Sequence, residues 1–167
     1  RGLGDVYKRQ DAAGDELAEA GDKWTEALKT EAAATTNNDR FGTGIEGRWT
    51  GVPEALQVPL AALRDAAWKT NRQVSGIPAS EFANDSKKAA ERLAVIVATE
   101  ELNDTCVRIL NASRVGEGNS ADDEDLLGED VIWYTADSGP RAPKHVVRVA
   151  PLSVADLLRQ RLFGRNT

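Results

Sequence analysis

Methionine is absent from the sequence, cysteine and histidine occur once each, and aromatic residues make up only 5%. The single Cys106 excludes an internal disulfide framework and a cysteine-rich metal site within the chain. No apolar run approaches the roughly 18–20 residues that cross a bilayer, so no membrane span is expected. A mean hydropathy of −0.45 and the near absence of cysteine favour a soluble protein of a reducing cytoplasm.

The two ends of the sequence predict a fragment. The chain begins without methionine, and the segment DVYKRQ at residues 5–10 resembles a translated adapter from sequencing-library preparation. We therefore expect residues 1–10 to be a disordered artefact, excluded from fold reasoning. At the other end a helical pattern runs into Gly164, and only basic and polar residues follow up to Thr167. We therefore expect a parent protein that continues on both sides of this sequence.

Charge is distributed unevenly along the chain. Residues 11–140 carry 12 Lys+Arg against 25 Asp+Glu, whereas residues 141–167 carry six basic residues against Asp156 alone. Phosphate backbones repel the first part and attract the second. Any nucleic-acid contact is therefore expected near the C-terminal end.

Apolar periodicity predicts three helices in the first two thirds of the chain. The first runs from Asp11 to about Ala34, and a loop at residues 36–51 follows, which we expect Trp49 to pin onto the helices. The second begins near Pro53 and ends near Ser75; its Leu56, Leu60, Leu63 and Ala67 form one stripe, and Pro59 either kinks it or marks its true start.

The third predicted helix is the longest. It opens at Ser80, with Asp85 placing negative charge in its first turns, and extends for about 30 residues. Its apolar stripe contains Val95, Thr99, Leu102, Cys106 and Ile109, and is widened by Leu93, Ile96 and Leu110.

The remainder of the chain predicts strands and a short helix. Two β-branched and aromatic runs, VIWYTAD and HVVRVA, read as a β-hairpin. Ser153 then caps a short helix that carries Val154, Leu157, Leu158 and Leu162. The expected fold class is mainly α, an antiparallel helical bundle followed by a hairpin and helix that belong to an incomplete domain.

Several motifs suggest chemistry but lack its context. Gly42 to Gly47 satisfy G-x-G-x-x-G, yet neither a preceding strand nor an immediate helix is predicted, so a glycine-rich loop is the better interpretation. The acidic run Asp122–Asp125 lacks the spaced ligands of a calcium loop. We interpret His145 as an edge histidine and Cys106 as an inert core thiol. No catalytic, cofactor-binding or metal-binding residue is predicted within the chain.

Three arginines near the C-terminus are the candidates for contact with DNA phosphate: Arg159, Arg161 and Arg165. The alternative is that these cations complement the dipole at a helix C-terminus. The residues alone do not decide between the two.

The segment VIWYTADSGPRAPKHVVRVAPLSVADLLRQRLFGRNT resembles the region before the Ser-Ala-Thr motif of DinG-type ATP-dependent DNA helicases, the bacterial relatives of XPD. Members of that family show a strand with an aromatic residue, a second strand ending in an Ala-Pro-Leu-like turn, and a short helix closing in Leu-Phe. The corresponding elements are residues 131–134, 146–151 and 154–163. The likeness is close over about 37 residues and looser over residues 11–128.

The resemblance implies a domain organisation and an activity. Residues 11–128 are arch-like, the helical insertion between the DEAH box and the Ser-Ala-Thr motif, and residues 129–167 are the return into the first RecA-like domain. The implied parent enzyme unwinds duplex DNA while moving along single-stranded DNA with ATP and Mg²⁺, whose sites lie outside this chain. An iron–sulfur cluster occurs in some members, and its cysteines would also lie outside.

Two other interpretations stay open. One is a free-standing acidic helical-bundle module that binds a protein partner. The other is a related nuclease-helicase with an exonuclease domain far upstream.

Overall fold

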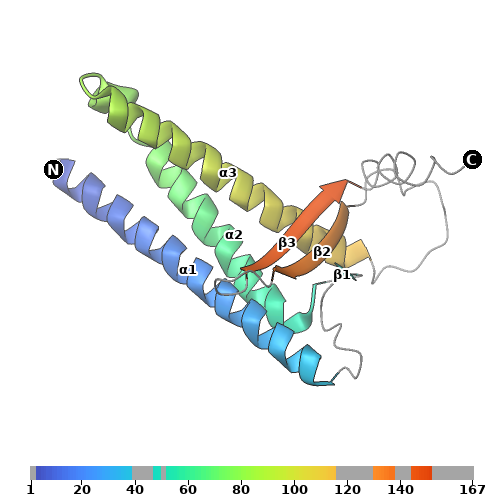
Figure 1. Cartoon of the computed structure of the whole chain (residues 1–167). Coiled ribbons are helices and arrows are strands. Elements are labelled where there is room, and N and C mark those ends of the chain that lie inside the picture. The colour runs from blue at the N-terminus through green and yellow to red at the C-terminus, as the bar shows by residue number, and fades with distance from the viewer. Residues whose placement is uncertain (1–2, 39–46, 50–51, 116–129, 138–143, 152–167) are drawn as a thin grey trace, which may run out of the picture. The chain divides into compact units, whose positions relative to one another are not determined.

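A computed structural model describes residues 3–38, 47–49, 52–115, 130–137 and 144–151. It is mainly helical and contains an antiparallel sheet (Figure 1). The chain divides into two compact units. The helical unit comprises residues 1–26 and 57–107, and the sheet unit comprises residues 27–56 and 108–167.

The first helix, α1, spans Leu3–Asn38 and is longer than predicted at both ends. Residues 3–10, expected to be disordered, continue its N-terminal turns. Extending a helix that has already formed adds one hydrogen bond for each residue fixed, which is far easier than nucleating a new one. The adapter-like segment contains no proline to stop this extension.

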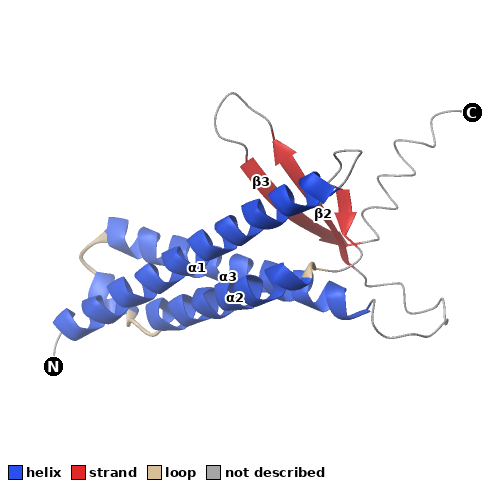
Figure 2. Ribbon diagram, turned by 90° about the horizontal axis from the view of Figure 1, so that it is seen from below, coloured by secondary structure: helices blue, strands red, loops and turns tan. Residues whose placement is uncertain are grey.

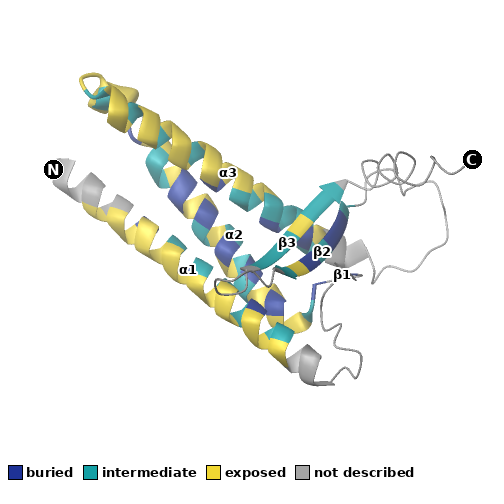
Figure 3. Ribbon diagram, viewed as in Figure 1, coloured by how far each residue is buried: buried dark blue, intermediate teal, exposed yellow. Residues whose placement is uncertain are grey.

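The second helix, α2, spans Glu54–Ser75 and confirms the predicted end. Pro53 directly precedes it, and its carbonyl accepts a hydrogen bond from the Leu56 N–H at 2.8 Å. Pro59 lies inside the helix, so it does not mark the start. The predicted stripe is confirmed, because its four apolar side chains are all buried: Leu56, Leu60, Leu63 and Ala67. Buried residues follow one side of α2 in Figure 3.

The third helix, α3, spans Ser86–Val115, and its 30 residues match the predicted length. Its predicted start at Ser80 is wrong: Ala79–Phe82 form a separate 3-10 turn, η1. The Asp85 carboxylate accepts a hydrogen bond from the Lys88 N–H at 3.0 Å, so Asp85 caps α3 rather than lying within its first turns. Arg92 donates to the carbonyls of Ser75 and Ile77, which secures the connection between α2 and α3.

The helical unit is joined by buried polar side chains as well as apolar ones. Thr70 of α2 donates to the Ala13 carbonyl of α1 at 3.2 Å. The next residue, Asn71, donates to the Ile96 carbonyl and to the Thr99 hydroxyl of α3, at 3.0 and 3.1 Å. Asn103 of α3 donates to the Arg64 carbonyl of α2. These contacts place α2 antiparallel to both neighbouring helices.

The sheet unit contains three strands in the order β1-β2-β3, all antiparallel. The predicted hairpin is confirmed as β2, Asp130–Asp137, and β3, Lys144–Pro151 (Figure 2). The third strand, β1, is Gly47–Trp49, within the segment predicted to be a loop. Its three residues and flanking glycines carry too short a pattern for sequence reasoning to detect a strand.

One face of this sheet is buried in the core of the sheet unit. Ile132 and Tyr134 alternate along β2 on that face, and Trp49 is the register partner of Ile132. Other parts of the same unit contribute further buried apolar residues: Leu28, Val52, Leu56 and Ile109. The Arg108 guanidinium donates from Nε and Nη2 to the Asp130 carboxylate, at 2.9 and 2.5 Å, and so ties α3 to the start of β2.

Among the described helices, none combines the length and the apolar character needed to cross a membrane.

Candidate functional site

Most of the sequence-predicted site residues lie outside the described part of the chain. This holds for the three candidate phosphate contacts Arg159, Arg161 and Arg165, and for the acidic run Asp122–Asp125. Of the glycine-rich motif only Gly47 is described, and it begins β1 rather than a phosphate-binding turn. Their predicted roles stay predictions.

Cys106 is buried in the helical unit, as predicted. Burial raises the pKa of its thiol to about 11, while the Arg64 charge and a backbone hydrogen bond act in the opposite direction. The thiolate is the nucleophilic form of cysteine, and this site disfavours it. Cys106 is therefore a packing residue.

His145 lies on β3, where it is half-buried and stacked on Tyr134, with ring centroids 5.9 Å apart. Tyr134 stacks in turn on Trp49 at 6.1 Å, so three rings line up across three strands. The Tyr134 hydroxyl and His145 Nδ1 also share a hydrogen bond. A ring held in this way within the sheet contributes to packing and register. The expectation that His145 is not a catalytic base stays a prediction.

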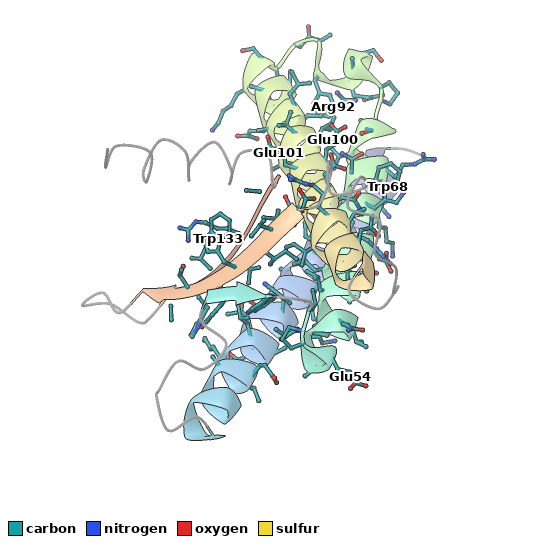
Figure 4. The ribbon with its side chains drawn as sticks, turned by 90° about the vertical axis from the view of Figure 1, so that its right-hand side faces the viewer. Glu54, Trp68, Arg92, Glu100, Glu101 and Trp133 are labelled. Atoms are coloured by element: carbon teal, nitrogen blue, oxygen red, sulfur yellow. The ribbon has the colours of Figure 1, made fainter. Side chains whose placement is uncertain are left out.

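The opposite face of the sheet brings together an aromatic ring and a cation. Trp133 of β2 is the register partner of Arg148 of β3, and register partners share a face of an antiparallel sheet. Figure 4 shows Trp133 projecting from the sheet. Arg148 is exposed and donates from Nη1 to the Thr135 hydroxyl at 3.0 Å, which holds its guanidinium along β2. We call Trp133, Thr135 and Arg148 the Trp133 face.

The Trp133 face has the chemistry of a single-strand contact. An aromatic ring on a sheet gives an unpaired base a surface on which to stack, and a neighbouring arginine attracts the phosphate backbone. Arg48 of β1 occupies the register position on the other side of Trp133. The backbone thus places an arginine on each strand that flanks the tryptophan.

Sequence reasoning missed the Trp133 face because it depends on strand register. Trp133 and Arg148 are 15 positions apart, and only the pairing of β2 with β3 makes them opposite neighbours. The sequence did contain one indication of this face. Val131, Trp133 and Thr135 are alternate residues of a predicted strand and therefore share one of its sides.

The helical unit holds a shallow groove between α1 and α2, with a volume of about 290 Å³. Three alanines form its floor: Ala20, Ala62 and Ala66. Lys69 crosses its rim to pair with Glu16 at 2.7 Å. Because its charged rim is engaged in this pair and its floor offers only methyl groups, we assign the groove no ligand.

No group of three or more potential metal ligands occurs among the described residues. Comparisons with protein-family models, with curated proteins and with solved structures find no match.

Proposed function

We propose that the chain is an internal segment of a DinG-like, ATP-dependent DNA helicase of the cytoplasm. In this proposal the helical residues 11–128 form the arch-like insertion, and residues 129–167 return into the first RecA-like domain. The parent enzyme moves along single-stranded DNA and unwinds duplex. ATP and Mg²⁺ bind elsewhere in the parent, so this chain alone hydrolyses no ATP.

The order of elements supports the proposal. A long helix, Ser86–Val115, precedes a strand with an aromatic residue, and a second strand leads into Ala150-Pro151-Leu152. This is the order that the resemblance implies.

The single observation that carries the proposal is the Trp133 face. In the proposed helicase it contacts the translocating single strand, with a base stacked on Trp133 and a phosphate near Arg148. The charge distribution favours this end of the chain, because the basic residues gather beyond residue 140. An acidic helical unit repels DNA, and in the arch it would help to confine the strand to a channel.

Binding of a fluorescein-labelled oligothymidylate to the full chain tests the Trp133 face. Trp133→Ala is expected to weaken binding about fivefold or more, the loss of one stacked base. Trp133→Phe should retain most of the affinity because it keeps a ring. Arg148→Ala should weaken binding and lower the slope of log affinity against log salt by about 0.7, as for one single-strand phosphate contact.

Trp68→Ala provides the matched control, since Trp68 is an exposed tryptophan of α2 outside the sheet. It should bind DNA as the unchanged chain does. If Trp133→Ala and the unchanged chain bound DNA with equal affinity, the sheet would not be part of the contact. The proposal would then lose the observation on which it depends.

The parent assignment is tested separately by extending the coding DNA. A Ser-Ala-Thr motif downstream, with a phosphate-binding loop and a DEAH box upstream, is the expected result. A stop codon directly after Thr167 would instead favour the free-standing acidic module that binds a protein partner.

A further inference from the structure

Among the large apolar side chains that the helical unit exposes, three belong to one side of two neighbouring helices. Trp68 of α2 is 49% exposed, and Leu93 and Val97 of α3 are 58% and 52% exposed. Single exposed apolar residues are ordinary, whereas a contiguous patch marks an interaction site. Trp68, Leu93 and Val97 form such a patch if they lie on the same side of the two helices.

Helical periodicity places them on one side of the α2/α3 pair. Asn71 and Asn103 fix which side of each helix faces the other, through their bonds to Thr99 and to the Arg64 carbonyl. Leu93 and Val97, followed by Glu100 and Asp104, recur at spacings of four, three and four, one flank of α3 beside that contact.

Trp68 lies on the matching flank of α2. It precedes Asn71 by three residues, and the antiparallel register brings it level with the turn of α3 that contains Glu100. In Figure 4 Trp68 and Glu100 lie on one side of α3 and Glu101 lies on the other. α1 leaves this flank open, because it contacts α2 through Thr70 and Lys69. We call Trp68, Leu93, Val97, Glu100 and Asp104 the Trp68 face.

The charges on the Trp68 face define what fits it. Glu100 and Asp104 follow Leu93 and Val97 along the same side of α3, and both are exposed. On α2 the Arg72 guanidinium lies 5.7 Å from the Trp68 ring centre and covers part of it. An acidic border beside an apolar strip repels nucleic acid and a second copy of this acidic unit, and attracts lysine and arginine.

We propose that the Trp68 face is a docking site for a partner protein, which binds it through an amphipathic helix with one apolar side and a basic border. Leucine-sized side chains of that helix pack on Trp68, Leu93 and Val97, and its basic residues pair with Glu100 and Asp104. An exposed tryptophan on the same side as aliphatic residues is typical of the residues that dominate binding energy at protein interfaces. This function goes beyond DNA contact and does not depend on the helicase assignment.

A synthetic 18-residue leucine–lysine amphipathic peptide, labelled with fluorescein, tests the proposal against the full chain. Fluorescence anisotropy is expected to show saturable binding. A leucine–glutamate peptide of the same pattern should bind at least tenfold more weakly. The double variant Leu93→Ser and Val97→Ser should weaken binding of the lysine peptide at least tenfold, and Glu100→Gln with Asp104→Asn should lower its salt dependence.

The matched control is the double variant Ala94→Ser and Ala98→Ser. It places two serines at the same spacing on another exposed side of α3 and should leave binding unchanged. Circular dichroism melting confirms that each variant is folded. Equal weakening by both double variants, or equal binding of the acidic peptide, would overturn the proposal. So would self-association of the chain that Leu93→Ser abolishes, because the face would then be covered by a second copy.

Discussion

Single polar residues decide how the helices of the helical unit align. Thr70 and Asn71 are consecutive, so their side chains leave α2 about 100° apart, and each contacts a different helix. Both are buried, and a buried polar group is tolerated only when hydrogen-bonded. Apolar contacts between alanine and leucine side chains would permit several registers of the helices. These hydrogen bonds form in only one register.

Replacement of Asn71 by alanine is expected to lower the free energy of unfolding by about 1–2 kcal/mol. The substitution removes the donor that joins two acceptors on α3, and Thr99 is left with fewer partners in a buried site. Urea denaturation followed by circular dichroism measures the loss. Asn84→Ala, at an exposed position, should change stability by less than about 0.5 kcal/mol. Similar values for the two variants would show that the bridge contributes little.

Cys106 gives stability a predictable pH dependence. Its pKa is raised by burial from 9.0 to about 11. The unfolded chain therefore releases the thiol proton first, and the stability that the neutral thiol supplies is complete below pH 9 and is lost as the pH rises towards 11.

The stability advantage of the unchanged chain over Cys106→Ala should accordingly narrow between pH 9 and pH 11. Denaturant titrations of both proteins across that range measure it, and the comparison cancels the titration of groups that the two proteins share. The native thiol should also react slowly with a disulfide reagent at pH 9. Rapid labelling of the folded chain would contradict the burial of this group.

At the scale of elements, local signals determined where helices exist, and side-chain caps determined where they begin. The 30 residues of α3 were predicted, yet its start was not, because Ser80 and Asp85 are both acceptable caps. Ser80 lies within η1, which directly follows Pro78. The Asp85 carboxylate provides the cap that α3 uses. The apolar residues of α3 were likewise recognised, but Leu93 and Val95 are exposed, whereas Thr99, Cys106 and Ile109 are buried.

Two glycines at helix positions should respond oppositely to substitution by alanine. A Cβ at Gly14 of α1 meets nothing within 4 Å, so Gly14→Ala should stabilise the chain by about 1 kcal/mol through helix propensity. A Cβ at Gly76 would lie 3.2 Å from the Arg72 carbonyl, directly after α2, so Gly76→Ala should destabilise. Thermal melting of the two variants compares them. A loss of stability in Gly14→Ala would mean that α1 does not extend through that residue as an ordinary helix.

At the scale of the whole molecule, charge is divided between an acidic part, residues 11–140, and a basic part, residues 141–167. The sequence alone supports this inference, because counting Lys, Arg, Asp and Glu needs no structure. Arg159 and Arg161 lie outside the described residues, and their contact with phosphate stays a prediction.

Substitution of both Arg159 and Arg161 by alanine is expected to flatten the salt dependence of binding to single-stranded DNA. Each lost phosphate contact should lower the slope of log affinity against log salt by about 0.7. Oligothymidylate titrations at several salt concentrations give that slope. An unchanged slope would assign these cations to the helix terminus instead, where they complement its dipole.

The sequence by itself determined the helical character of the first two thirds, the hairpin of β2 and β3, and the core position of Cys106, because each follows from periodicity or composition within a short window. Tertiary structure decided the rest. Only strand pairing placed Arg148 opposite Trp133 and drew Gly47–Trp49 into the sheet. Only the register that Asn71 sets placed Trp68 level with the turn of α3 that contains Glu100. Such neighbours are distant in sequence, and local propensity contains no information about which of them meet.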